Sequence, residues 1–231
     1  MSRVITIVSL LLVLPAGLFA WQWFSLPDIG SLATENPRST AFIDLYREAN
    51  GQDVALQWQW VPYDDISIEL KRAVVVAEDK YFFSHGGFSF LDIRKSIAEA
   101  LRERKTVRGA STLSQQLSKN LWLSPAGTLT RKAREAVMTI RLERELTKRR
   151  ILEIYLNVAE FAPGVYGAEA AARNRFHCSA AEINAEQGAA LAACLPNPAH
   201  SLPENAGEAY RERFEKILHR ASNAEWLDRE L

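Results

Sequence analysis

Apolar residues recur at helical spacing along most of the chain, which predicts a mainly α-helical protein. In the stretch from Arg108 to Asn157, Leu113, Leu117 and Leu121 form one apolar stripe. The run Ile66–Lys80 has the same periodicity, although its three consecutive valines would also suit a buried strand.

Polar residues in the same central stretch are also ordered. Thr112, Gln116 and Lys119 fall on one face of the first predicted helix. Arg131 and Glu135 are one turn apart on the next helix and therefore point the same way. Fixed cations around a carboxylate would suit an anionic leaving group. The alternative is that these side chains are ordinary solvated surface charges.

Other segments follow similar patterns. Alternating apolar residues before Pro62 predict a short strand, and Thr147 is a suitable N-cap for a further helix. Phe88–Glu103 is predicted to be an amphipathic helix that packs on the core or contacts a membrane surface. Ala185–Leu195 is a small-residue helix that ends at prolines.

The N-terminus carries an apolar run that predicts a membrane anchor. Val4–Phe24 contains no charge and matches the ~20 residues that cross a bilayer, while Arg3 places the N-terminus in the cytoplasm. A cleaved signal peptide is the alternative, but the cleavage site would be poor. The predicted organisation is an anchor over 1–25, a linker over 26–40 and one domain over 41–231.

Composition narrows the function classes only slightly. The 231 residues include 28 basic and 28 acidic side chains, so nothing global favours a nucleic-acid partner. Cys178 and Cys194 lack metal-ligand spacing and are interpreted as packing residues.

An acidic pair ends the Ile66–Lys80 helix. Glu78 and Asp79 are followed by three aromatic residues and then by His85. A carboxylate that emerges beside aromatics is partly desolvated and is a better base near neutral pH. An exposed acidic helix end is the alternative.

These motifs, taken in order, resemble a known family. The segments that carry the resemblance are AVVVAEDKYFFSHGGF, RGASTLSQQLSKN, RKAREAVMTIRLERELTKRRILEIYLN and GVYGAEAAARNRF with LAACLPNP. They resemble the motifs of peptidoglycan glycosyltransferases of the penicillin-binding-protein type. The chain is similar to the monofunctional biosynthetic members of that family. The resemblance covers roughly Leu70 to Pro198.

The resemblance implies a fold, an activity and a location. It implies a lysozyme-like, mainly helical glycosyltransferase domain that polymerises lipid II at the outer, periplasmic face of the cell inner membrane. An acceptor hydroxyl would attack the anomeric carbon, and polyprenyl diphosphate would leave with inversion. The implied partners are lipid II, the growing glycan strand, the membrane and proteins of division or elongation complexes, with no nucleic acid.

The resemblance also implies roles for individual residues. Glu78 and Glu135 are the implied catalytic residues. The implied substrate-binding residues are Asp79, Phe82, His85, Ser111, Thr112, Gln115, Gln116, Lys119, Asn120 and Arg131.

Charge considerations agree with this assignment. Lys119 and Arg131 are the right types of residue for a diphosphate leaving group. Glu135 would orient these cations or hold a divalent cation, Mg²⁺ or Mn²⁺, that bridges phosphate oxygens. The general base is expected to stand apart from the cations, because they would weaken it.

Several positions depart from the family pattern and put full activity in question. The departing residues are Ser89, Gly127, Arg175, Cys178 and Gln187. The Gly127 change removes a phosphate contact for which Lys132 or Arg134 is a candidate substitute. Two other functions remain open, a lysozyme-like glycan-cleaving enzyme and a non-catalytic lipid II or division-complex binding module.

Overall fold

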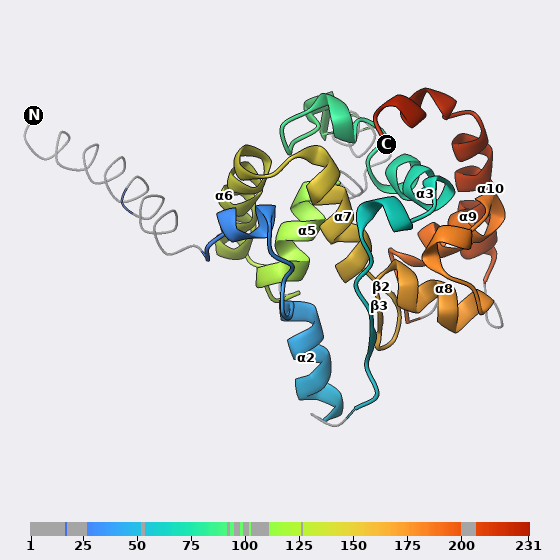
Figure 1. The fold of residues 1–231 in the computed structure, drawn as a ribbon. Coiled ribbons are helices and arrows are strands. Elements are labelled where there is room, and N and C mark those ends of the chain that lie inside the picture. The colour runs from blue at the N-terminus through green and yellow to red at the C-terminus, as the bar shows by residue number, and fades with distance from the viewer. Residues whose placement is uncertain are drawn as a thin grey trace, which may run out of the picture.

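The computed structural model describes residues 17, 27–51, 54–91, 93–94, 98, 102, 111–125, 127–199 and 207–231. The predicted mainly α-helical class is confirmed in this part of the chain (Figure 1). The helices are α2 (Ala41–Asn50), α3 (Ile68–Glu78), α5 (Leu113–Trp122), α6 (Leu129–Glu145), α7 (Lys148–Val158), α8 (Ala168–Phe176), α9 (Ala185–Cys194) and α10 (Glu208–Ser222). Short 3₁₀ turns are η1 (Gly30–Ala33), η2 (Tyr63–Asp65), η3 (Phe82–Ser84), η4 (Ala180–Glu182) and η6 (Glu225–Arg229).

The described helices form two groups. In Figure 1, α5, α6 and α7 lie on one side of the molecule, and α3, α8, α9 and α10 lie on the other. A small sheet joins them, with β1 (Gln57–Trp58) parallel to β3 (Val165–Tyr166) and β2 (Glu160–Ala162) antiparallel to β3. The predicted strand before Pro62 is therefore present but short.

Helix α3 runs through the centre of the second group. Ser67 caps it by accepting a hydrogen bond from the backbone N–H of Glu69 (3.1 Å), and every residue from Leu70 to Val76 is buried. Close packing against α9 is possible because Gly188 has no side chain, since a Cβ there would lie 3.0 Å from the Glu69 carbonyl oxygen. The β-branched valines are thus helical because tertiary burial overrides local propensity.

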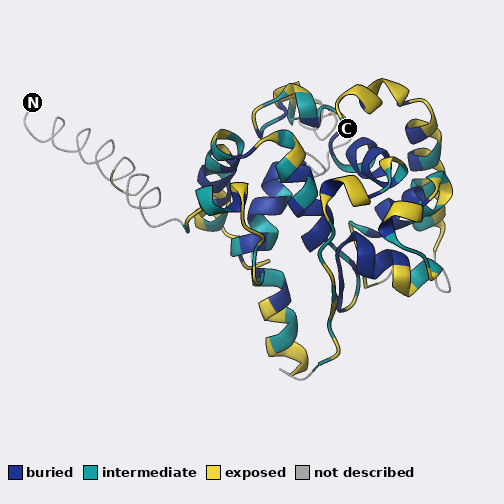
Figure 2. Ribbon diagram, in the orientation of Figure 1, coloured by how far each residue is buried: buried dark blue, intermediate teal, exposed yellow. Residues whose placement is uncertain are grey.

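The hydrophobic core lies where the facing sides of the helices meet, as the buried faces in Figure 2 show. The predicted stripe of Leu113, Leu117 and Leu121 is buried in this core. Ile29 and Leu32 also belong to it, so packing begins before residue 41, inside the segment predicted to be a linker.

Two predictions from sequence fall mainly outside the described residues. Among the described residues, none of the helices is both long and apolar enough to cross a bilayer. Apart from Gly17, the predicted anchor Val4–Phe24 is not described. Most of Phe88–Glu103 is likewise not described, although Phe90 and Leu91 within it are exposed.

Candidate active site

The carboxylate of Glu78 is held from two sides. Glu78 is the last residue of α3, and its side chain retains 11% of its exposure. Gln116 Nε2 of α5 donates to Oε2 (2.7 Å), and Arg213 Nη2 of α10 donates to Oε1 (2.6 Å). The predicted partial desolvation is confirmed. The predicted separation of this acid from Lys119 and Arg131 did not anticipate another cation, Arg213, which reaches Glu78 because α10 packs on α3.

Gln116 is itself fixed by a buried tyrosine. Tyr155 of α7 is almost fully buried, and its hydroxyl donates to Gln116 Oε1 (3.0 Å). Burial raises the pKa of this phenol well above its usual value, as does the nearby Glu78 carboxylate, so it stays a donor at neutral pH. With Oε1 accepting from Tyr155, the amide nitrogen of Gln116 is directed at Glu78.

A second carboxylate lies in a cluster of cations on α5 and α6. Glu135 is buried, with Arg131 Nη1 donating to its Oε2 (2.7 Å) and Lys132 ion-paired to its Oε1. The predicted one-turn pairing of Arg131 and Glu135 is therefore present. Lys132, a candidate substitute for the cation missing at Gly127, is part of the same cluster.

Lys119 connects the two acids electrostatically. Burial lowers the pKa of its ammonium, and Glu135 is the largest opposing influence. Arg131 and Lys132 also lower this pKa, and Glu78 raises it. Lys119 and Gln116, which holds Glu78, are three residues apart on α5, and α5 packs on α6, which carries Glu135. The two acids therefore belong to one region of the molecule.

The site also has donors that the described protein atoms leave unsatisfied. The Nε atoms of Arg131 and Arg213 are buried and have no hydrogen-bond partner among the described residues. Buried N–H groups are nearly always paired. Each N–H can donate to an oxygen of an incoming ligand, Arg131 beside Glu135 and Arg213 beside Glu78.

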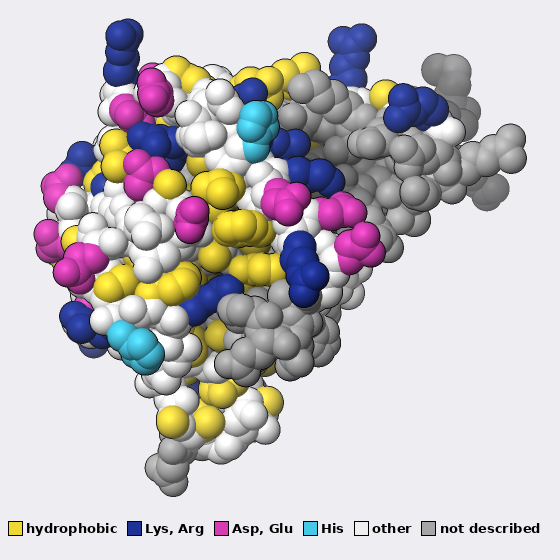
Figure 3. Space-filling view, turned by 90° about the vertical axis from the view of Figure 1, so that its right-hand side faces the viewer, with side chains coloured by type: hydrophobic (Ala, Val, Ile, Leu, Met, Phe, Trp, Pro, Cys, Tyr) yellow, Lys and Arg dark blue, Asp and Glu magenta, His cyan; other side chains and the backbone are white. Residues whose placement is uncertain are grey.

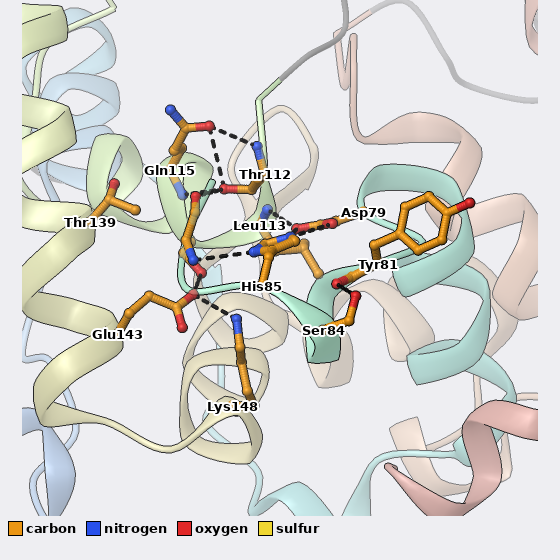
Figure 4. A network of polar contacts seen from close by, with 12 residues as sticks. Asp79, Tyr81, Ser84, His85, Thr112, Leu113, Gln115, Thr139, Glu143 and Lys148 are labelled. Atoms are coloured by element: carbon orange, nitrogen blue, oxygen red, sulfur yellow. Dashed lines mark hydrogen bonds and ion pairs between the residues drawn. The ribbon is translucent and has the colours of Figure 1, made fainter. Parts of the chain in front are cut away.

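Asp79 and His85 have a different role from Glu78. Asp79 is buried, and its Oδ2 accepts from the backbone N–H of Leu113 at the start of α5 (3.0 Å). The backbone N–H of Gly87 donates to His85 Nδ1 (3.1 Å), which leaves the ring proton on Nε2, facing Asp79 Oδ1 (3.0 Å). Figure 4 shows this network, which fastens the loop after α3 to the start of α5.

Gly87 closes the same loop by its backbone. Its φ is +90°, a conformation that favours glycine, and a Cβ there would lie 2.8 Å from Thr139 Cγ2. Its carbonyl oxygen accepts from Thr112 Oγ1 (2.7 Å). The loop therefore depends on this glycine for both its shape and its contact with α6.

Thr112 and Gln115 form hydrogen bonds with each other and do not project into an open cavity. Thr112 is the N-cap of α5, and its Oγ1 accepts from the backbone N–H of Gln115 (3.2 Å). Gln115 Oε1 accepts in return from the backbone N–H of Thr112 (3.0 Å), which completes a capping box. Both side chains are buried, so in this structure they stabilise the helix start.

The other predicted substrate-binding residues are placed as follows. Phe82 is fully buried in the core, with Lys148 Nζ lying 4.3 Å from its ring centroid. Ser111 is exposed just before α5, and Asn120 is partly exposed on α5 itself. The structure thus brings Gln116 to Glu78 and Arg131 to Glu135, and it places Lys119 Nζ 5.5 Å from the ring centroid of Phe42. The other predicted residues, Asp79, Phe82, His85, Thr112 and Gln115, have contacts within the protein.

Two of the departures from the family pattern, Arg175 and Gln187, have local structural roles. Arg175 donates through Nη2 to the hydroxyl of Tyr210 (2.8 Å) and through Nη1 to Cys194 Sγ (2.9 Å), linking α8, α9 and α10. Gln187 forms a capping box at the start of α9. Ser89 is buried, Cys178 is a half-buried free thiol, and Gly127 is exposed with open space around it.

The residues around Glu135 do not fit a divalent cation. Mg²⁺ and Mn²⁺ prefer a set of oxygen ligands. Both oxygens of Glu135 are bound by Arg131 and Lys132, and no cluster of three metal-binding side chains occurs in the part of the chain that the structure describes. A cation at Glu135 would have to displace one of these side chains.

Two residues of the site were missed by sequence reasoning. Arg213 is 135 positions from Glu78 in the sequence, and no local pattern indicated that it would reach this acid. Tyr155 lies in an apolar run. A hydroxyl on an otherwise apolar helix face was the signal that this residue has a hydrogen-bond partner in the core. The sequence T-x-x-Q at Thr112–Gln115 likewise carried a capping-box signature.

Comparisons with known proteins agree on one family. Residues 47–222 match the family model described as transglycosylase. A biosynthetic peptidoglycan transglycosylase from Azoarcus sp. is 46% identical over 184 residues, which cover 78% of this chain and 80% of that protein. Proteins of the same name are 52% identical in Methylobacillus flagellatus, over 71% of this chain and 72% of that protein, and 40% identical in Dechloromonas aromatica, over 94% and 96%.

Proposed function

Because the chain belongs to the transglycosylase family and is a peptidoglycan glycosyltransferase of cell-wall synthesis, we propose that it joins lipid II units into β-1,4-linked glycan strands. In this proposal the domain has a lysozyme-like fold and works in the periplasm. Val4–Phe24 anchors it in the inner membrane, where it meets lipid II, the growing strand and the proteins of a division or elongation complex.

Glu78 is the proposed general base. The 4-hydroxyl of the acceptor sugar gives its proton to Glu78 as its oxygen attacks the anomeric carbon of the donor. Gln116 and Arg213 already hold this carboxylate in one orientation, and each oxygen keeps a lone pair for the incoming proton. Such prior fixation is what general-base catalysis requires, because the base must be placed before the proton moves.

Lys119, Arg131 and Lys132 are the proposed cations for the leaving group. The bond from the anomeric carbon to the diphosphate oxygen breaks as the new glycosidic bond forms, and negative charge develops on the diphosphate. The buried Nε–H of Arg131 and the partly desolvated ammonium of Lys119 would stabilise that charge. Glu135 keeps Arg131 and Lys132 in place, which makes it a positioning residue.

The observation that best supports the proposal is that α5 carries both Lys119 and Gln116, which holds Glu78 (2.7 Å), and packs on α6, which carries Glu135 and its cations. A proton acceptor and a phosphate-binding cluster must lie within the span of one reacting sugar for the displacement to occur. No step of this mechanism uses a divalent cation, because the donor atoms around Glu135 are those of an ion-pair cluster.

The test is polymerisation of labelled lipid II by the full-length protein in detergent. We expect glycan strands and polyprenyl diphosphate from the wild type, and a loss of at least about 100-fold in rate for Glu78→Gln. Glu48→Gln, the same change at an exposed residue of α2, serves as the control and should be fully active. Cleavage of finished glycan, or binding of lipid II without turnover, would refute the proposal.

A further inference from the structure

A groove lies between the end of α3 and the outer side of α10, next to Glu78. It consists of two adjoining cavities of about 290 and 520 Å³ that share Arg220 as a lining residue. Its charged lining residues, which define the α3–α10 groove, are Lys80, Glu212, Arg213, Lys216, His219 and Arg220. Apart from Arg213, none of these lining residues has a role in the mechanism above.

The groove is lined by more basic than acidic side chains. Lys216 is paired with Glu212 (3.3 Å) and Arg213 with Glu78 (2.6 Å). Lys80 and Arg220 have no acidic partner among the described residues. The face that carries α8, α9 and α10 is turned to the viewer in Figure 3, where basic, acidic and hydrophobic side chains are mixed. The positive charge is therefore a property of the groove and not of the whole face.

The groove also offers donors and apolar walls. The Nε–H of Arg213 is buried and has no partner among the residues that the structure describes. Arg220 is an exposed guanidinium whose planar set of donors suits carboxylate or phosphate oxygens. Ala77, Ile217 and Ala224 line the same cavities, and apolar walls strengthen the field of nearby charges. The site is built for an oxyanion attached to a partly apolar chain.

The position of the groove identifies the molecule that would enter it. One end is Arg213, which touches the proposed base, and the groove extends along α10 to Asn223, about 15 Å farther at 1.5 Å per residue. An acceptor sugar at Glu78 is much shorter than this. The occupant must therefore be a charged extension of the acceptor, either its peptide carboxylates or its lipid diphosphate.

The arrangement of the helices favours the peptide. In Figure 1, α10 lies on the opposite side of the molecule from α6, which carries Arg131 and Lys132 and against which η1 packs. The described chain begins near α6, so an N-terminal anchor would bring lipid phosphates to that side. The peptide branches from the sugar next to the reacting one and is free to point toward α10.

We propose that the α3–α10 groove binds the carboxylate-bearing peptide of the acceptor, with Arg220 and Lys80 as its principal ligands. This inference rests on the proposed function, because it takes Glu78 as the residue at which the acceptor hydroxyl sits. The groove then selects acceptors by the charge of their peptide and holds the hydroxyl in register with Glu78.

The test compares two substrates and two variants of the full-length protein. Arg220→Gln removes one groove cation, and Arg211→Gln makes the same change on the same helix at an exposed residue that does not line the groove. Each variant is assayed with lipid II that carries free peptide carboxylates and with lipid II whose peptide carboxylates are amidated. We expect Arg220→Gln to raise KM about tenfold for the acidic substrate only, and Arg211→Gln to change nothing.

The other outcomes are distinguishable. An equal rise in KM for both substrates would overturn the peptide assignment, since it would place the lipid diphosphate in the groove. An unchanged KM for both substrates would overturn the groove itself while leaving the polymerase activity standing. Failure of the wild type to polymerise either substrate would refute the proposed function first. Thermal melting checks that both variants are folded.

Discussion

Asp79 offers the sharpest test of how the site is built, because the family resemblance assigns it to substrate and the structure gives it a structural role. Its carboxylate accepts from the backbone N–H of Leu113 and from His85 Nε2, and thereby joins the loop after α3 to the start of α5. Asp79→Asn keeps one carbonyl oxygen but turns the other acceptor into an NH₂ donor. One of these two N–H groups then faces another donor in a buried site.

The expected cost follows from these contacts. Asp79 is 5% exposed, so the lost charge-assisted hydrogen bond and the unpaired donor are little relieved by water. Together they should lower the free energy of unfolding by about 2–4 kcal/mol. For a chain of this size that corresponds to a decrease of roughly 5–15 °C in melting temperature.

Urea unfolding followed by tryptophan fluorescence, together with thermal melting, measures this loss. Asp65→Asn is the control, since Asp65 is an exposed acid in η2 and should melt like the wild type. A stable Asp79→Asn protein with a raised KM for lipid II would contradict the reasoning. It would show that Asp79 contacts the substrate directly.

Further expectations concern the charged groups of the site. Arg213→Gln should lower kcat about 10- to 100-fold with little change in KM, because Glu78 loses one of its two hydrogen-bond donors. Arg213→Lys should recover part of the rate. A kcat of Arg213→Gln within about twofold of wild type would refute this role. Burial lowers the pKa of the Lys119 ammonium from its ordinary value of 10.5. If catalysis needs the charged ammonium, the rate should therefore decline with rising pH before pH 10.5 is reached. Because Glu135 raises that pKa, Glu135→Gln should move this limb of the pH–rate profile to lower pH, and a shift to higher pH would contradict the assignment. Removal of metal with EDTA should change the polymerisation rate by less than about twofold, and a large loss restored by Mg²⁺ would show that a cation displaces the partners of Glu135.

Local patterns in the sequence were sufficient to predict the helices that carry the site. The spacing of Leu113, Leu117 and Leu121 predicted the buried face of α5, and the one-turn spacing of Arg131 and Glu135 predicted their ion pair. Both features are set within a single helix, where the geometry of the turn fixes which side chains meet.

Long-range contacts were not predictable in the same way. Arg213 reaches Glu78 only because α10 packs on α3, and no local pattern encodes that packing. The capping contacts of Thr112 and Gln115 were not predicted for a different reason, because a threonine and a glutamine three residues apart serve equally well as a capping box or as substrate ligands. Composition suggested a free linker over 26–40, and it gave no sign that Ile29 and Leu32 would find core positions.

That last segment is fastened as well as buried. Arg150 of α7 donates through Nε to the carbonyl oxygen of Leu32 (2.7 Å) and through Nη2 to that of Glu35 and to Asn36 Oδ1 (2.8 Å each). The segment from Leu32 to Asn36 is therefore fixed to α7 and moves with the domain. In the membrane-anchored enzyme proposed above, a segment fixed in this way would shorten the free connection between the anchor and the catalytic domain.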